Sequence, residues 1–202
     1  MTSRNPRLRL GAQLAATTVA AAVAALLLIK PVLGVLMERN SIHNGPWRTS
    51  ADTGAVDANP WSRAAVAIAG LYALSRQEAI YYTAFTDSSG DALRGECVYT
   101  VSGTTPDARW WSLTVYGADH FLVPNPENRY AVNAVNLPSA ATGRIDLTLS
   151  GDAAAIQHRA DALPVPAQGA FSLTLRLYNP PPAMATQLAS VPLPAIQRGG
   201  CA

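Results

Sequence analysis

The feature that most constrains this chain is a run of 20 uncharged residues from Leu10 to Ile29. As a helix rising 1.5 Å per residue, the run would span about 30 Å, which is the thickness of a bilayer core. Arg4, Arg7 and Arg9 precede it, and no acidic residue comes before residue 38. The positive-inside rule therefore predicts a cytoplasmic N-terminus and an exported body.

Two interpretations of this run stay open. A cleaved signal peptide has a shorter apolar core that is followed by a small-x-small site. Here the Ala-x-Ala pattern at Ala20–Ala22 lies inside the run, and none follows it cleanly. We expect residues 1–9 to be a cytoplasmic tail and residues 10–37 to be an uncleaved signal anchor. The partner of residues 10–37 is then the inner membrane, with the body in the periplasm, if the source is a Gram-negative bacterium.

The composition excludes some classes of function. Charged residues make up 14% of the chain, against about 25% in an average soluble protein, which argues against a disordered charged tail. The net charge is only +2, and residues 1–37 hold four basic residues and no acid. We therefore predict no nucleic-acid partner, because the excess of positive charge is confined to the N-terminal segment.

Turn-forming residues predict a linker over residues 38–59, in which Trp47 is expected to dock onto the domain that follows. Asn59 and Pro60 are typical of an N-cap and a first helical position. They predict a helix over residues 61–74. One face of this helix, expected to pack on a sheet, carries residues at spacings of three and four: Ala65, Ile68, Ala69 and Tyr72.

Beyond this helix the hydrophobic period changes from 3.6 to 2, and a turn at Asp87–Gly90 predicts a hairpin. Short strands at regular intervals favour a mainly β fold, an antiparallel β-sandwich or jelly-roll-like domain over residues 60–202. The expected strands cover residues 79–85, 96–102, 110–116, 129–135, 145–149 and 171–178. Prolines after the last strand predict an extended C-terminal segment across the edge of the sandwich.

Cys97 and Cys201 are the only two cysteines. An oxidising compartment permits a disulfide, and we expect one that joins the C-terminal tail to the strand around Cys97. A reactive thiol, an attachment point on the Gly199–Cys201 end and two unpaired thiols are the alternatives.

The candidate ligand-binding residues are an arginine and aromatic side chains on two strands. Arg176 and Tyr178 lie opposite the leucines of their strand, and Trp110 and Tyr116 share one face of theirs. If the two strands are neighbours, a guanidinium, two phenols and an indole converge, and Arg129 is a further candidate. Such a face could bind a carboxylate or a sugar, because arginine forms paired hydrogen bonds to carboxylates and aromatic rings stack on apolar ring faces.

The alternative is an ordinary outer face, on which Arg176 pairs with Asp146 or Glu127. The loop 125–130 likewise has two interpretations, a ligand lip or a tight entry into the next strand.

No motif for catalysis, phosphate binding or dinucleotide binding is present. His120 with Ser112 is a weak candidate for a catalytic pair, and the acids Glu127, Asp146 and Asp152 lack the spacing of a calcium loop. We predict no catalytic residue, no cofactor and no metal. The expected function is a non-catalytic envelope module that binds a small molecule, a glycan or a protein. A hydrolase-like enzyme acting on a carboxylate- or sugar-like substrate is the alternative, and a scaffold that meets a membrane protein through residues 10–29 is a third possibility.

Four blocks in this order carry a resemblance to a known family: residues 110–116, residues 124–130, Leu163–Pro166 with Gly169 and Phe171, and residues 175–180. They resemble the family of domain of unknown function 1214, over roughly residues 60–197. The resemblance implies an antiparallel β-sandwich and a bacterial origin, but no reaction. Two departures from the family's pattern are expected. A membrane anchor stands where the family's larger, two-domain exported members carry an N-terminal domain, and Asp161-Ala162 stands where relatives often carry a tryptophan.

Overall fold

A computed structural model of the chain describes residues 6–68 and 74–201, in two compact units. The first unit, Met1–Asn40, contains α1 (Pro6–Arg39). Within α1, Leu10–Ile29 has a mean hydropathy of 2.1, and among the described residues it is the one segment long and apolar enough to cross a membrane. The predicted N-terminal apolar helix is confirmed. Thr17 and Thr18 inside it donate their hydroxyl protons to the carbonyl of Leu14, so these polar groups are satisfied within the helix.

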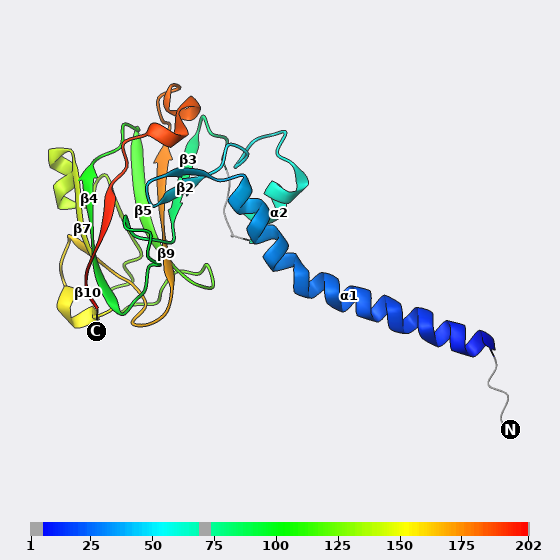
Figure 1. The fold of residues 1–202 in the computed structure, drawn as a ribbon. Coiled ribbons are helices and arrows are strands. Elements are labelled where there is room, and N and C mark those ends of the chain that lie inside the picture. The colour runs from blue at the N-terminus through cyan, green and yellow to red at the C-terminus, as the bar shows by residue number, and fades with distance from the viewer. Residues whose placement is uncertain (1–5, 69–73, 202) are drawn as a thin grey trace. The chain divides into compact units, whose positions relative to one another are not determined.

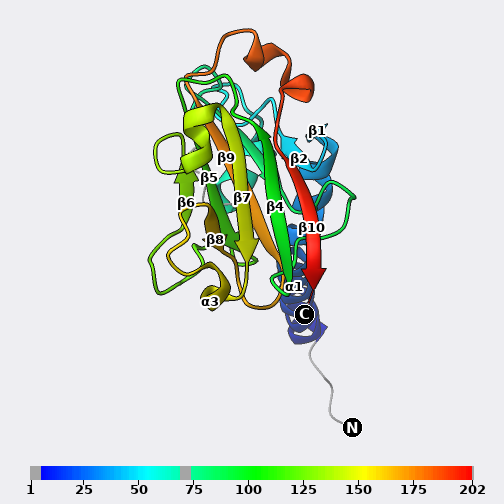
Figure 2. The ribbon, with the colours of Figure 1, turned by 90° about the vertical axis from the view of Figure 1, so that its left-hand side faces the viewer.

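The second unit, Ser41–Ala202, is a sandwich of two β-sheets (Figures 1 and 2). One sheet has the order β1-β2-β3-β9-β5-β6 and the other the order β10-β4-β7-β8. The strands are β1 (Ile42–Asn44), β2 (Trp47–Thr49), β3 (Ala79–Ala84), β4 (Cys97–Thr104), β5 (Trp110–Gly117), β6 (Ala131–Asn133), β7 (Arg144–Ser150), β8 (Ala162–Pro164), β9 (Phe171–Tyr178) and β10 (Ala195–Cys201). The helices of this unit are α2 (Pro60–Ile68), α3 (Ala153–Ile156) and the 3₁₀ turns η1 (Pro138–Thr142), η2 (Met184–Thr186) and η3 (Leu188–Ser190).

The core lies between the two sheets, and alternation along the strands sets which residues fill it. The leucines of β9 that were expected to face inward, Leu173, Leu175 and Leu177, are fully buried. On the opposite sheet Ile145, Leu147 and Leu149 of β7 are buried in the same core cluster. The mainly β sandwich fold is therefore confirmed.

The segment 38–59 differs from the predicted linker, because it contains β1 and β2. The Asn44–Trp47 turn that suggested a loop joins these two strands as a hairpin, with Gly45 at a φ of 59°. Trp47 is fully buried, and its indole N–H donates to the carbonyl of Pro194 at 2.7 Å. Strands of three residues are too short to show an alternating pattern, so β1 and β2 could not be predicted from periodicity.

The prediction of a hairpin at Asp87–Gly90 is wrong, because the two strands that flank this turn do not pair with each other. The turn closes only a local bridge between Thr86 and Ala92, and the strands on its two sides, β3 and β4, belong to different sheets. The purely antiparallel arrangement also fails at one edge, since β8 runs parallel to β7. The extended C-terminal segment lies at a sandwich edge, as expected, where β10 pairs with β4.

The predicted helix after Asn59 is present as α2, and the Asn59 carboxamide oxygen caps it by accepting from the Ser62 amide at 2.9 Å. One face of α2 was expected to be buried against a sheet. This prediction is wrong for Ile68, which is 53% exposed. Two other members of that predicted face, Ala69 and Tyr72, lie outside the described residues, as do residues 69–73 of the predicted helix.

Candidate functional site

The six-stranded sheet has an outer face on which the predicted ligand-binding residues gather. Strands β5 and β9 are antiparallel neighbours, with Trp110 opposite Tyr178 and Ser112 opposite Arg176. On the other side of β9, Tyr81 of β3 is opposite Arg176. We call this surface the Arg176 face, and it is defined by Tyr81, Thr83, Trp110, Ser112, Thr114, Tyr116, Ser172, Thr174, Arg176 and Tyr178.

Arg176 is half-buried and donates two hydrogen bonds, both to neutral hydroxyl groups. Its Nη1 donates to the Thr114 hydroxyl at 3.1 Å, and its Nη2 donates to the Tyr116 phenol oxygen at 2.7 Å. A guanidinium carries five N–H donors. Among the residues that the structure describes, the other three donors of Arg176 have no hydrogen-bond partner.

Aromatic rings surround this guanidinium. Its central carbon lies 5.5 Å from the ring centre of Tyr116 and 6.0 Å from that of Tyr81, within the range of cation–π attraction. The rings of Trp110 and Tyr178 lie beside each other, with centroids 5.1 Å apart. The face thus combines one cation with the surfaces of several aromatic rings.

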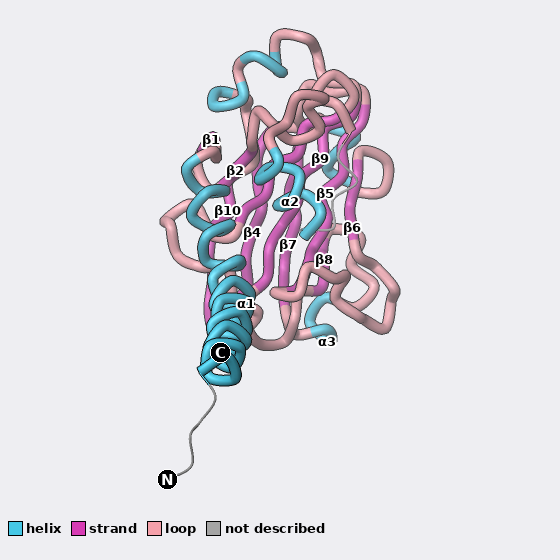
Figure 3. Tube along the Cα trace, turned by 90° about the vertical axis from the view of Figure 1, so that its right-hand side faces the viewer, coloured by secondary structure: helices cyan, strands magenta, loops and turns pink. Residues whose placement is uncertain are grey.

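Small polar residues of this face are buried, although they point away from the sandwich core. Thr174 is 3% exposed and shares a hydrogen bond of 3.3 Å with the Thr83 hydroxyl. Figure 3 shows α2 in front of this sheet. The amide of Leu74 donates to the Tyr81 phenol oxygen at 3.1 Å, so part of this cover is bonded directly to the face.

The two carboxylates that could have neutralised Arg176 are engaged elsewhere. Asp146 forms an ion pair with Arg144 at 3.1 Å. Glu127 accepts a hydrogen bond from the His158 amide at 2.7 Å. Within residues 6–68 and 74–201, no carboxylate forms an ion pair with Arg176.

Arg129, the remaining predicted ligand-binding residue, has its contacts in a different place. Its guanidinium donates to the carbonyls of Arg159 and Ala160. With Glu127, Asn136 and His158 it lines a separate surface hollow of about 450 Å³. Arg129 therefore ties two loops together, and we do not group it with Arg176.

The loop 125–130 is held by hydrogen bonds between the Asn125 side chain and the Arg129 backbone. The Asn125 carboxamide donates to the Arg129 carbonyl at 3.0 Å and accepts from the Arg129 amide at 3.0 Å. Asn128 has a φ of 50°, in the left-handed region that asparagine tolerates. This geometry is that of a tight entry into β6.

The weaker catalytic and metal candidates have ordinary structural surroundings. His120 lies in an exposed turn, and no hydrogen bond joins it to Ser112 in the described part of the chain. Asp152 caps α3 by accepting from the Ala154 amide at 3.0 Å. The described residues contain no group of three or more potential metal ligands.

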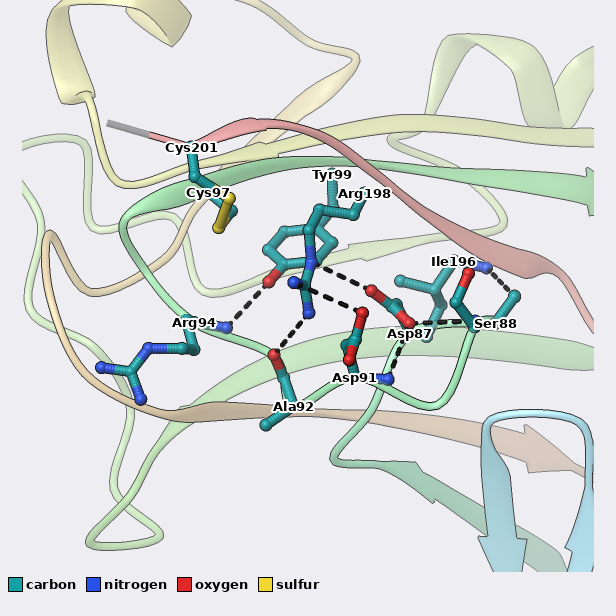
Figure 4. A network of polar contacts seen from close by, with 11 residues as sticks. Asp87, Ser88, Asp91, Ala92, Arg94, Cys97, Tyr99, Ile196, Arg198 and Cys201 are labelled. Atoms are coloured by element: carbon teal, nitrogen blue, oxygen red, sulfur yellow. Dashed lines mark hydrogen bonds and ion pairs between the residues drawn. A yellow bond between two sulfur atoms is a disulfide. The ribbon is translucent and has the colours of Figure 1, made fainter.

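A polar network holds the C-terminal strand at the other sheet (Figure 4). Cys201 is joined to Cys97 by a disulfide, directly across the β10–β4 pair. Farther along β10, Arg198 lies 3.0 Å from the buried carboxylate of Asp87 and also donates to the Ala92 carbonyl. The Ser88 hydroxyl accepts from the Ile196 amide at 2.9 Å. The ion pair with Arg198 accounts for the burial of the Asp87 carboxylate, so this network has a structural role.

The sequence pattern missed two members of the Arg176 face, Tyr81 and Thr83. Alternation along residues 79–84 places both on the face opposite Ile80 and Tyr82, so the sequence could have predicted that they point away from the core. Their neighbours could not be known, because alternation does not show that β3 lies beside β9.

A family model described as "Protein of unknown function (DUF1214)" matches residues 78–182, a range that contains the whole Arg176 face. The crystal structure of the VPA0106 protein from Vibrio parahaemolyticus has a similar fold, with a TM-score of 0.59 and 24% identity over 71% of this chain and 36% of that one. A putative uncharacterized protein from Burkholderia cenocepacia gives a TM-score of 0.41 and 16% identity over 62% of this chain and 30% of that one. The chain thus spans about a third of the length of these solved structures. No curated protein matches it in sequence.

Proposed function

Because the chain belongs to the DUF1214 family, whose function is unknown, we propose from its own residues that it is a membrane-anchored module that binds a small carboxylate at the Arg176 face without catalysing a reaction. The anchor is α1, and the binding domain lies on the exported side, in the envelope of a bacterium. The apolar length of Leu10–Ile29 supports the anchor, and the arginines before it support this orientation.

The observation that carries the proposal is the half-buried guanidinium of Arg176 that has no carboxylate partner among the described residues. Burying part of a charge is costly unless a counter-charge or hydrogen bonds compensate it. A carboxylate ligand would supply both, through two parallel N–H···O bonds. The rings of Trp110 and Tyr178 would cover the apolar part of the same ligand.

Binding is favoured over hydrolysis by the groups that surround Arg176. Its described hydrogen-bond partners are hydroxyl and phenol groups. General acid–base catalysis most often uses an imidazole or a carboxylate within about 3 Å of the reacting proton. Neither kind of group contacts Arg176 in the described part of the face.

The test is a thermal-shift and calorimetric titration of the full chain in detergent against a panel of aliphatic, aromatic and sugar-derived carboxylates. We expect a carboxylate to bind and its neutral amide analogue not to bind. Arg176→Gln should weaken binding by roughly 10-fold or more, since a hydrogen bond to a charged group contributes about 1.5–3 kcal/mol.

The matched control is Arg144→Gln, which removes an exposed arginine from the opposite sheet. This variant should bind like the original chain. Equal loss in both variants, or no carboxylate that binds, would overturn the proposal. Conversion of a bound carboxylate to a product would replace it with the hydrolase alternative.

A further inference from the structure

Outside α1, three of the eight exposed large apolar residues in the described part of the chain lie in α2 or just before it. Val56 is 91% exposed, Trp61 55% and Ile68 53%. Trp61 and Ile68 are seven positions apart, which places them on the same face of the helix. Figure 3 shows α2 on the outer side of the six-stranded sheet, so these side chains do not belong to the sandwich core.

The chain keeps the start of the folded domain near any bilayer that contains α1. Only two residues separate the end of α1 at Arg39 from the start of β1 at Ile42. From Ile29 to Arg39 the helix rises about 15 Å, and the three Cα–Cα steps from Arg39 to Ile42 add at most about 11 Å. The domain therefore starts within roughly 26 Å of the end of the apolar run, a distance that includes the polar headgroup layer, about 5–7 Å thick.

We propose that the α2 surface, defined by Val56, Trp61 and Ile68, docks onto the lipid bilayer that holds α1. Tryptophan suits this place, because its ring is apolar and its N–H needs a polar partner, as the headgroup region provides. An exposed apolar stripe on a helix is the feature by which helices lie in a membrane interface. A lipid surface is the occupant that the short connection to α1 brings within reach without a further protein.

Trp61 is also a reporter of this contact. The other tryptophans are Trp47, Trp110 and Trp111, and α1 has none. Trp47 and Trp111 are at most 3% exposed, and Trp110 is half-buried. Trp61 is thus the tryptophan that lipid chains would reach most readily.

The experiment places the full chain in nanodiscs of phosphatidylcholine and phosphatidylglycerol, with or without bromine atoms on the acyl chains. Bromine quenches a tryptophan that enters the bilayer. We expect brominated lipid to quench the chain clearly and to quench Trp61→Phe less than half as much. Ile68→Asp, which keeps the reporter and charges the docking face, should also reduce the quenching.

The matched control is Val135→Asp, which charges another exposed apolar residue outside the α2 surface. Its quenching should equal that of the original chain. Equal quenching of the original chain and Trp61→Phe would overturn the docking. So would a Trp61 that is shielded from aqueous acrylamide but not reached by bromine, because a second protein would then cover the helix.

The docking rests on the membrane anchoring proposed above, and the two can fail separately. Retention of the chain by purified nanodiscs reports on α1. A chain that is not retained overturns both the anchor and the docking. A retained chain whose Trp61 is not quenched overturns the docking alone.

Discussion

Glu96 shows how a single surface carboxylate can stabilise a loop crossing. Its Oε1 accepts from the Gly169 amide at 3.2 Å and lies 3.3 Å from the Arg94 guanidinium. Hydrogen bonds from the backbone amides of Glu96 itself and of Gly169 are the main causes that lower the pKa of this carboxyl. Glu96 thus joins the start of β4 to the turn before β9.

Glu96→Gln tests this role through the pH dependence of stability. A carboxyl whose pKa is lower in the folded chain stabilises it above the unfolded-state value, here 4.5, and the effect is lost as the pH falls through the folded value. The melting temperature of Glu96→Gln should therefore be lower than that of the original chain at pH 7. The difference should shrink below pH 4.5. An equal difference at pH 7 and at pH 3 would contradict the assignment.

At the scale of residues, the sequence predicted which way a side chain points better than it predicted which residues that side chain contacts. The period of two along residues 110–116 and 171–178 placed Trp110, Tyr116, Arg176 and Tyr178 on outer faces, and the structure brings these four together. It does not bring Arg129 to them. A strand pattern fixes which way a side chain points, whereas the partner of a long side chain depends on the path of a distant loop.

At the scale of elements, β10 is an edge strand held at several points. Four consecutive ladder positions, from Ala195 to Arg198, pair it with β4, and the register shifts between Arg198 and the disulfide-linked Cys201. The glycines Gly199 and Gly200 lie in that shift. The disulfide therefore closes the end of the strand, while Arg198 and Ser88 hold its middle.

Replacing both cysteines with serine should separate these two contributions. A disulfide that closes a loop of this length stabilises the folded state by about 2–5 kcal/mol, and we expect a loss in that range in urea unfolding of the full chain. Hydrogen exchange should become faster at Gly199 and Gly200 but change little at the Ile196 amide, which donates to Ser88. Equal loss of protection at both ends would show that β10 detaches as one unit.

Long elements were predictable, whereas of the three-residue strands in the described part of the chain only β6 lies within a predicted range, 129–135. Strands of six or more residues with clear alternation, such as β5, β7 and β9, appear near their predicted ranges. The three-residue strands β1, β2 and β8 carry no periodic signal, and β10 is rich in glycine. The pairing of β3 with β9, rather than with β4 across the Asp87 turn, depends on the packing of the whole sandwich.

At the scale of the whole molecule, the chain divides after Asn40 rather than at the domain start that the sequence suggested. Residues 42–49 complete the six-stranded sheet, and the buried Trp47 binds the carbonyl of Pro194. The folded unit therefore needs residues on the N-terminal side of α2.

Two truncations test this boundary. Residues 41–202 should unfold cooperatively with a near-ultraviolet spectrum typical of packed aromatic residues. Residues 60–202 should be less stable by at least about 3–5 kcal/mol, the usual cost of removing a buried tryptophan side chain. Urea unfolding of the two chains, followed by circular dichroism, checks the difference. Equal stability would mean that the β1–β2 hairpin is dispensable.

The position of β9 has a consequence for the order of events during folding. It lies between β3 and β5, so two strands made early are joined only by one that is synthesised about 55 residues after the second of them. Until residue 178 is available, β3 and β5 have no common partner and their inner leucine, valine and tyrosine side chains have no complete core. Contacts that span so much chain form slowly. The six-stranded sheet therefore cannot be completed until the last third of the chain is made, whereas β4, β7 and β8 of the other sheet can pair before then.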